Sequence, residues 1–134
     1  MTVGEWECIE LAVDSGATET VISEEMVTSV DTKEGQGSRR GVMYETANGE
    51  RIPNLGEKRF IAHTEEGLER KVTTQVADVR KALLSVKKIV AAGNRVVFDE
   101  SSFIEDKSTG SKTWLHGDNG MYMLKMWMKH GEGF

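Results

Sequence analysis

The segment LAVDSGAT, residues 11–18, places an acidic side chain where an apolar run ends. Asp14 directly follows Leu-Ala-Val and precedes Ser15 and Gly16. An Asp-Ser-Gly sequence is commonly a connecting turn in which the carboxylate accepts hydrogen bonds from nearby backbone. Here the carboxylate follows a strand-like apolar run, where leaving it without hydrogen bonds would be costly. The hydroxyls of Ser15 and Thr18, and the close approach that Gly16 permits, favour a rigidly held carboxylate that could take part in chemistry.

The composition narrows the classes of function. A chain of 134 residues is the size of one domain, and its net charge is -5. No basic stretch interleaved with aromatic residues is present and no apolar run is long enough to cross a bilayer, so we expect neither nucleic acid nor a membrane as partner. Cys8 is the single cysteine, which predicts a reducing compartment. The three scattered histidines lack metal-ligand spacing, so no metal site is expected.

The pattern of apolar residues and glycines predicts a mainly β fold. Fourteen glycines and one proline separate short apolar segments. Ile9, Leu11 and Val13 alternate along the first of these segments, which predicts a strand with one buried face. The segment TVISEEM is a second short extended candidate, and residues 31–41 are polar and glycine-rich, which predicts a mobile surface loop.

Two hairpins are predicted in the middle of the chain. Asn48 and Gly49 form a strong two-residue turn signal between strand formers, so VMYETANGERI is expected to be a β-hairpin. A second hairpin is expected to follow, with its turn at Glu66 and Gly67.

One short helix is predicted in the C-terminal half. Ser85 can cap its start, Val86, Ile89 and Val90 fall on one stripe, and Gly-Asn at 93–94 provides a stop. Four short strands are predicted beyond it, in the segments RVVFDE, SFIEDK, KTWLHG and GMYMLKMWM.

Several segments together resemble one protein family. LAVDSGATETVI resembles the active-site segment of retropepsin-like aspartic proteases, in which two hydrophobic residues precede Asp, Ser or Thr, Gly, and Ala or Ser. The chain is similar, more narrowly, to the protease region of Copia-type LTR retrotransposon polyproteins. The other matching segments, in the expected order, are ANGERIPNLGEKRF for the flap, VADVRKALLSVKKIVAAGNRVVFDE for a helix opened by Leu-Leu-Ser-Val, and GDNGMYML for the downstream ending.

The resemblance implies a retropepsin-like acid protease barrel that is homodimeric. In that family two carboxylates share one proton around a water molecule. The chain has one Asp-Ser-Gly, so a homodimer would pair Asp14 with the Asp14 of a second copy. The implied activity is an aspartic endopeptidase that cuts a retroelement polyprotein at extended peptide segments without a metal or organic cofactor. The implied location is intracellular, in the cytoplasm or a virus-like particle.

The resemblance also assigns roles by position. Asp14 would be catalytic and residues 15–18 would form the active-site loop. The active-site loop would comprise Ser15, Gly16, Ala17 and Thr18, and Leu83 and Leu84 would support it. The flap that closes over the peptide would include Thr46, Ala47, Asn48 and Gly49.

The organisation of the C-terminal part is left open by the sequence. We predict a protease core over residues 1–93 and a C-terminal β extension over residues 94–134, either interface strands or the start of the next polyprotein region. The methionine-rich segment at 121–128 fits both a core strand and a dimer-interface strand. The alternative function is a catalytically silent peptide-binding or assembly dimer on the same fold, and a weaker one is an inactive monomeric precursor.

Overall fold

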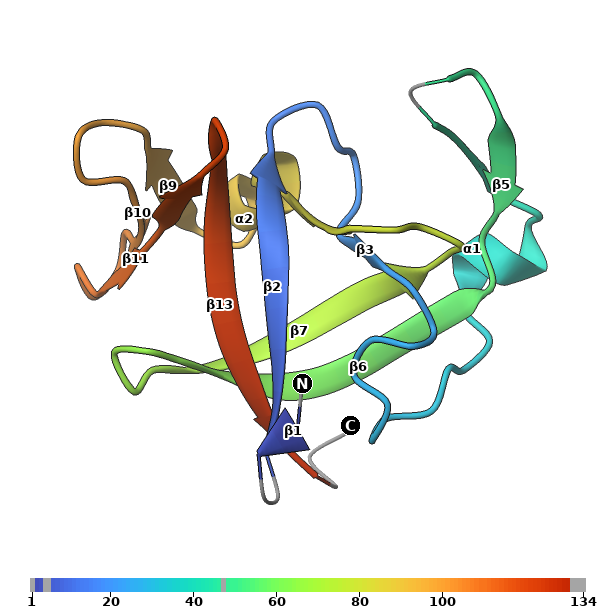
Figure 1. The fold of residues 1–134 in the computed structure, drawn as a ribbon, viewed down its shortest axis with the longest axis horizontal. Helices are drawn as coiled ribbons and strands as arrows, with labels where there is room; N and C mark the ends of the chain where they lie inside the picture. Colours follow the sequence, from blue (N-terminus) through green and yellow to red (C-terminus); the bar gives the residue numbers. More distant parts are fainter. Residues whose placement is uncertain (1, 4–5, 47, 131–134) are drawn as a thin grey trace.

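The computed structural model describes residues 2–3, 6–46 and 48–130 and is mainly β (Figure 1). This confirms the prediction that the fold is mainly β. The main sheet is mixed, and over these residues its strand order is β1-β2-β8-β3-β7-β6-β13-β12. Its strands are β1 (Thr2–Val3), β2 (Trp6–Asp14), β3 (Val21–Ile22), β6 (Gly56–Thr64), β7 (Glu69–Val76), β8 (Ala82–Ser85), β12 (His116–Asp118) and β13 (Met121–Lys129).

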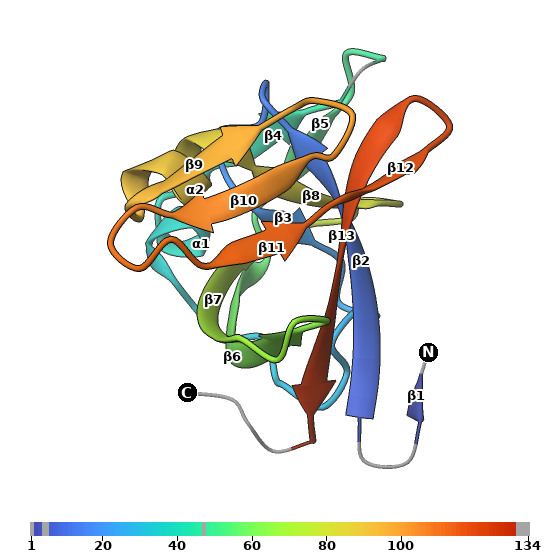
Figure 2. The ribbon, with the colours of Figure 1, turned by 90° about the vertical axis from the view of Figure 1, so that its left-hand side faces the viewer.

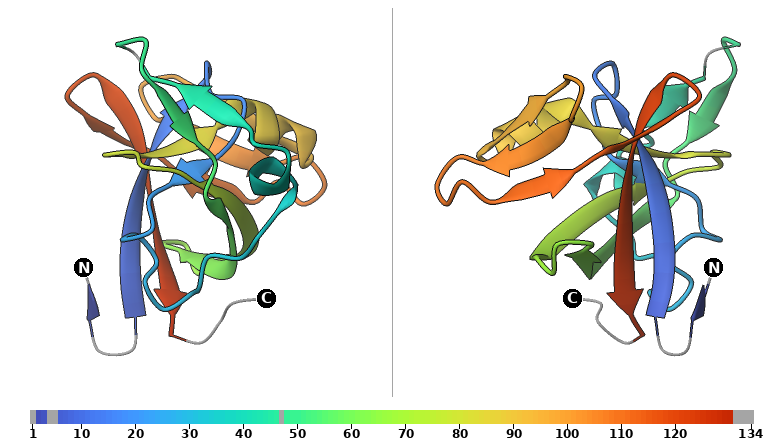
Figure 3. Two further views of the ribbon diagram at one scale, coloured as in Figure 1. Left: turned by 90° about the vertical axis from the view of Figure 1, so that its right-hand side faces the viewer. Right: turned by 60° about the vertical axis from the view of Figure 1, so that its left-hand side comes forward.

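The sheet closes on itself through β13. This strand pairs with β6 on one side and with β2 on the other. The β2–β13 ladder is antiparallel and runs from Met123 opposite Ala12 to Lys129 opposite Trp6. Figures 1 and 3 show β13 and β2 side by side along their length. In sheet order, β2, β8, β3, β7, β6 and β13 therefore form a closed ring, and this ring encloses the core.

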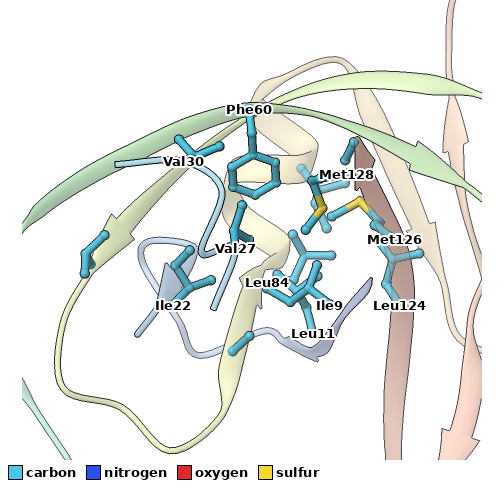
Figure 4. Packing of buried hydrophobic residues seen from close by; sticks show 14 of the residues in the cluster. Ile9, Leu11, Ile22, Val27, Val30, Phe60, Leu84, Leu124, Met126 and Met128 are labelled. Carbon is cyan, nitrogen blue, oxygen red and sulfur yellow. The ribbon is translucent and has the colours of Figure 1, made fainter. Parts of the chain in front are cut away.

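Alternating side chains from the closed sheet fill the core. Ile9 and Leu11 are buried and Val13 is half-buried, which confirms the buried face predicted for β2. Met126 and Met128 alternate in the same way along β13 and pack against β2 (Figure 4). Burying one side chain of this size contributes about 1.5–3 kcal/mol. The methionine-rich segment is thus a core strand with both edges paired inside the chain.

Smaller elements flank the closed sheet. A two-stranded hairpin is made by β4 (Met43–Glu45) and β5 (Arg51–Pro53). A three-stranded sheet, seen face-on in Figure 2, is made by β9 (Asn94–Val97), β10 (Phe103–Asp106) and β11 (Lys112–Trp114). The helices are α1 (Gln36–Arg39) and α2 (Val86–Ala91), and none of the described helices is long and apolar enough to cross a membrane.

Helix α2 begins as predicted. Ser85 is its N-cap, and the Ser85 hydroxyl accepts a hydrogen bond from the Lys88 N–H at 3.2 Å. Ile89 is buried, as the predicted apolar stripe requires. Val90 is 47% exposed, so the stripe is narrower than predicted because a helix of this length turns only one side chain fully into the core.

Residues 31–41 are more ordered than a surface loop. Lys33 forms a β-bridge with Glu57, and α1 follows it. Gly37 makes the close packing possible, because a Cβ there would lie 2.5 Å from the side-chain nitrogen of Asn54. Most of residues 31–41 lie at the surface, as predicted, and the short helix and the bridge are regular structure that the prediction of a mobile surface loop did not include.

Both predicted hairpins are confirmed, with one difference in turn length. The β6–β7 hairpin turns at Gly67, whose φ is +82°. In the β4–β5 hairpin the Thr46 N–H donates to the Glu50 carbonyl at 2.8 Å, and the Gly49 N–H donates to the Thr46 carbonyl at 2.9 Å. The connection is therefore longer than the two-residue turn predicted at Asn48 and Gly49.

The C-terminal segments form strands as predicted, and KTWLHG contributes to two of them. Leu115 is buried between the end of β11 and the start of β12, and the chain changes sheets there. The division at residue 93 stays a prediction. Across it, β13 lies in the same sheet as β2 and β6.

A buried lysine organises the loop after β3. Lys58 is 3% exposed, and its ammonium donates to the carbonyls of Glu24, Met26 and Val27 at 2.9, 3.1 and 3.1 Å. Burial lowers the pKa of Lys58, and the buried Glu7 carboxylate nearby partly offsets this. Val27 has a positive φ of 56°, unusual for a β-branched residue, so the ammonium holds a strained turn in place.

Replacing this lysine should destabilise the fold. Lys58→Met should lower the free energy of unfolding by about 2–4 kcal/mol, because three buried or partly buried carbonyl groups lose a charged donor. The matched control is Arg59→Met, which removes a salt bridge with Glu57 whose arginine is exposed and should cost less than about 1 kcal/mol. Urea unfolding measures both, and equal effects would contradict the role given to Lys58.

Candidate active site

Asp14 is the last residue of β2, at the point where the chain leaves the sheet. It lies opposite Ser85 in the parallel β2–β8 ladder. Its Oδ1 atom accepts a hydrogen bond from the Gly16 N–H at 2.8 Å. A Cβ at position 16 would lie 3.3 Å from the same oxygen, so glycine leaves room for this contact. The Asp-Ser-Gly segment thus forms a turn that also fixes the orientation of the half-buried carboxylate.

The loop after Asp14 is held by Ser85, the last residue of the neighbouring strand β8. The Ser85 hydroxyl donates to the Ala17 carbonyl at 2.7 Å, and the Ser85 N–H donates to the Thr20 hydroxyl at 3.1 Å. This geometry follows from the strand order, because β8 lies between β2 and β3 and the loop joins those two strands. The side of the loop that carries Ser15 and Thr18 is exposed.

The Asp14 carboxylate lines a cleft with a volume of about 1050 Å³. One wall is the β4–β5 hairpin, which projects from the end of the molecule where β2 ends (Figure 3, left). A second wall is the segment at 78–83, which joins β7 to β8 and enters β8. The carboxylate, the hairpin and this segment come from three distant parts of the sequence.

The cleft brings together most of the residues that the sequence singled out. The predicted residues that line it are Asp14, Gly16, Ala17, Thr18, Thr46, Asn48 and Leu83. The side chains of Ser15 and Leu84 take no part, because Ser15 faces solvent and Leu84 is buried in the core. Gly49 is exposed at the hairpin turn, and Ala47 lies outside the described residues.

Sequence reasoning missed the second wall of the cleft. Residues 78–81 carry no motif of their own, although they immediately precede the Leu-Leu-Ser segment that pairs beside Asp14. That position was the available signal, since a connection into the strand next to the Asp14 loop must pass near that loop. Tyr44 and Ile52 were also missed, and alternation along the hairpin would have placed both on its inner face.

The inner face of the hairpin is apolar and is held by one amide. Tyr44 and Ile52 pack in a cluster with Val21. The Asn54 amide donates to the Tyr44 hydroxyl and to the Gln75 side-chain oxygen, both at 2.9 Å. Burial raises the pKa of Tyr44, so its hydroxyl is neutral at physiological pH. The cleft therefore offers an apolar wall with one neutral hydroxyl group.

The described residues contain no cluster of side chains suited to binding a metal ion. No group of three or more His, Cys, Asp or Glu side chains there lies close enough together to hold a metal ion.

No protein-family model matches the chain, and no significant match is found among curated proteins or solved structures.

Removing the Asn54 amide should loosen the hairpin wall. Asn54→Ala should lower the free energy of unfolding by about 1–3 kcal/mol, because buried partners of the amide lose their hydrogen bonds. Hydrogen exchange should accelerate across β4 and β5 more than across β6. Leu55→Ala, at an exposed neighbouring position, is the control and should change stability by less than about 0.5 kcal/mol. Unchanged exchange in the hairpin would show that the amide does not fasten it.

Proposed function

We propose that this protein is a retropepsin-like aspartic endopeptidase that acts as a homodimer and processes a retroelement polyprotein. The observation that carries the proposal is the position of Asp14, which is fixed by an Asp-Ser-Gly turn at the end of a core strand and lines a large cleft. The closed β sheet, the hairpin wall and the helix after β8 agree with the architecture expected for such a protease. The polyprotein substrate rests on the resemblance in sequence.

The chemistry requires a second carboxylate. Glu19 and Asp78 also line the cleft, but Glu19 forms a salt bridge with Lys88 at 3.4 Å and Asp78 is exposed. Neither is held by a turn like that of Asp14. A two-fold axis beside the loop would supply an identical Asp14, and like charges at close range make the pair share one proton.

The shared proton sets the order of the reaction. The ionised Asp14 takes a proton from a water molecule, whose oxygen attacks the scissile carbonyl carbon. The protonated Asp14 of the second copy donates its proton to the carbonyl oxygen, which gives a neutral gem-diol. Collapse of this intermediate breaks the C–N bond. The leaving nitrogen receives a proton from the first Asp14, which had taken it from water. The second Asp14 takes a proton from a hydroxyl group of the gem-diol, which becomes the carboxylic acid product. The dyad returns to the state with one proton.

The cleft suits an extended peptide. Its volume of about 1050 Å³ is at the upper end of ordinary small-molecule sites and can hold several residues of a chain. Tyr44, Ile52 and Leu83 offer apolar contacts for substrate side chains, and the hairpin backbone can pair with the peptide as an added strand. No cofactor takes part in the proposed reaction, and an intracellular site, in the cytoplasm or a virus-like particle, fits the proposed substrate.

Removal of the Asp14 carboxylate should abolish cleavage. Asp14→Asn should lower the rate of peptide-bond hydrolysis by about 10³-fold or more at mildly acidic pH, because the amide cannot accept the proton of water. Asp118→Asn removes an exposed carboxylate that does not line the cleft and is the matched control, with activity near that of wild type. Cleavage of unfolded protein substrates, followed by mass spectrometry, measures both, and pepstatin should inhibit the wild type.

Undiminished cleavage by Asp14→Asn would eliminate the assignment. A wild-type dimer that binds extended peptides but never hydrolyses them would instead favour the catalytically silent binding or assembly module.

Activity should depend on pairing of the chains. Because each copy supplies one carboxylate, activity per chain should rise with protein concentration until the dimer is saturated. An excess of Asp14→Asn mixed with wild type should suppress activity by forming mixed dimers with one carboxylate. Asp118→Asn added at the same excess should not suppress it, and sedimentation over the same concentrations reports the dimer directly. Activity independent of both concentration and mixing would rule out a shared dyad.

A further inference from the structure

Ser85 joins three elements at one fully buried point. The residue is 0% exposed and ends β8. Its hydroxyl donates to the Ala17 carbonyl at 2.7 Å and accepts from the Lys88 N–H of α2 at 3.2 Å, while its own N–H donates to the Thr20 hydroxyl at 3.1 Å. Both the donor and acceptor capacity of the hydroxyl are therefore used.

The loop that carries Asp14 has few other anchors. In the described part of the chain, the remaining polar contacts of residues 15–19 are the Gly16 N–H to the Asp14 carboxylate and the salt bridge from Glu19 to Lys88. The first of these lies within the loop. Among the described residues, the hydrogen bond and the salt bridge that join residues 15–19 to other segments therefore both come from Ser85 and Lys88, at the junction of β8 with α2.

We propose that Ser85 is a positioning residue that sets the location of Asp14 relative to its counterpart in the second copy. The proposal rests on the proposed function. Asp14 and Ser85 occupy the same register position on adjacent parallel strands, so the hydroxyl holds the loop directly below the carboxylate. A shift of the Ala17 carbonyl moves the turn that fixes Asp14, and it does so in both copies at once.

The proton-sharing pair makes this position matter for the reaction. The interaction between two carboxylates falls as their separation grows, so the two apparent pKa values of the pair converge when the loop relaxes. The pH range over which the pair carries a single proton then becomes narrower. A misplacement of about 1 Å in a reacting group can also lower a rate about 100-fold.

Ser85→Ala tests the proposal. We expect kcat to fall by about 10- to 100-fold with little change in KM, because the apolar walls that bind peptide are untouched. The pH profile of kcat should become narrower on both sides. The other ionisable groups lining the cleft are the same in wild type and variant: Glu19, Tyr44, Glu45, Glu50, Asp78, Arg80 and Lys81.

Ser102→Ala is the matched control. Ser102 is 3% exposed, and its hydroxyl also donates to a backbone carbonyl and accepts from a backbone N–H, both of Asp99 at 3.0 Å. It lies just before β10, away from the cleft residues. A similar loss of stability is expected, without a change in kcat or in the pH profile. All kinetics are measured where circular dichroism shows each variant to be folded.

Ser85→Cys is the graded variant, since it has a similar volume and a weaker donor. We expect kcat to fall in the order Ser, Cys, Ala, with the pH profile narrowing in the same order; Ser85→Cys alone decides the question if the alanine variant does not fold. A Ser85 variant that keeps the wild-type kcat and pH profile, as Ser102→Ala does, would overturn the positioning role alone. A wild-type protein without hydrolytic activity would overturn the proposed function and the positioning role together.

Discussion

The antiparallel ladder between β2 and β13 is the constraint on which the rest of the fold depends. It joins residues 6–12 to residues 123–129 and turns an open sheet into a ring. Closure removes the exposed edge that β2 would otherwise present along this length, and it buries alternating side chains of both strands in one core. The strand that ends at Asp14 is thereby held between β13 and β8, with β13 pairing as far as Ala12 and β8 pairing as far as Asp14.

The secondary structure could be predicted from the sequence, but the pairing of distant strands that closes the sheet could not. Alternation at Ile9 and Leu11, the glycine at position 67 and the cap at Ser85 each act within a few residues, so the sequence states them directly. A strand with one buried face looks the same whichever neighbours it has. The parallel pairing of β2 with β8, and the return of β13 to β2, depend on contacts between residues far apart in the chain.

Helix α1 is the sharpest case of a structure set at a distance. Its four residues, Gln36–Arg39, contain no apolar stripe and resemble a solvent-exposed turn. What fixes them is the close approach of Gly37 to Asn54, an amide that also holds the hairpin. Gly37 lies in a polar segment, which in the sequence indicates a flexible loop, but in the structure this glycine is needed for tight packing against Asn54.

The candidate site was predictable where it had a motif. Asp14 and its loop follow from the motif, and the hairpin from its Asn-Gly turn, but the wall at 78–81 has neither. The resemblance gives Leu83 and Leu84 the same role, although their side chains lie on different sides of β8. Because successive residues in a strand face opposite sides, Leu83 lines the cleft while Leu84 enters the core.

Symmetry imposes a final requirement on a dyad built from two copies of one loop. The two Asp14 carboxylates would have the same neighbours, so nothing in the protein alone could make one the base and the other the acid. A peptide has a direction, however, and binding it across a two-fold axis makes the two positions unequal. The substrate, by presenting its carbonyl oxygen to one side, would then decide which carboxyl group keeps the shared proton. In such a dimer the protein would have to hold the two loops equivalently, and the buried junction at Ser85 would provide the same anchor for each.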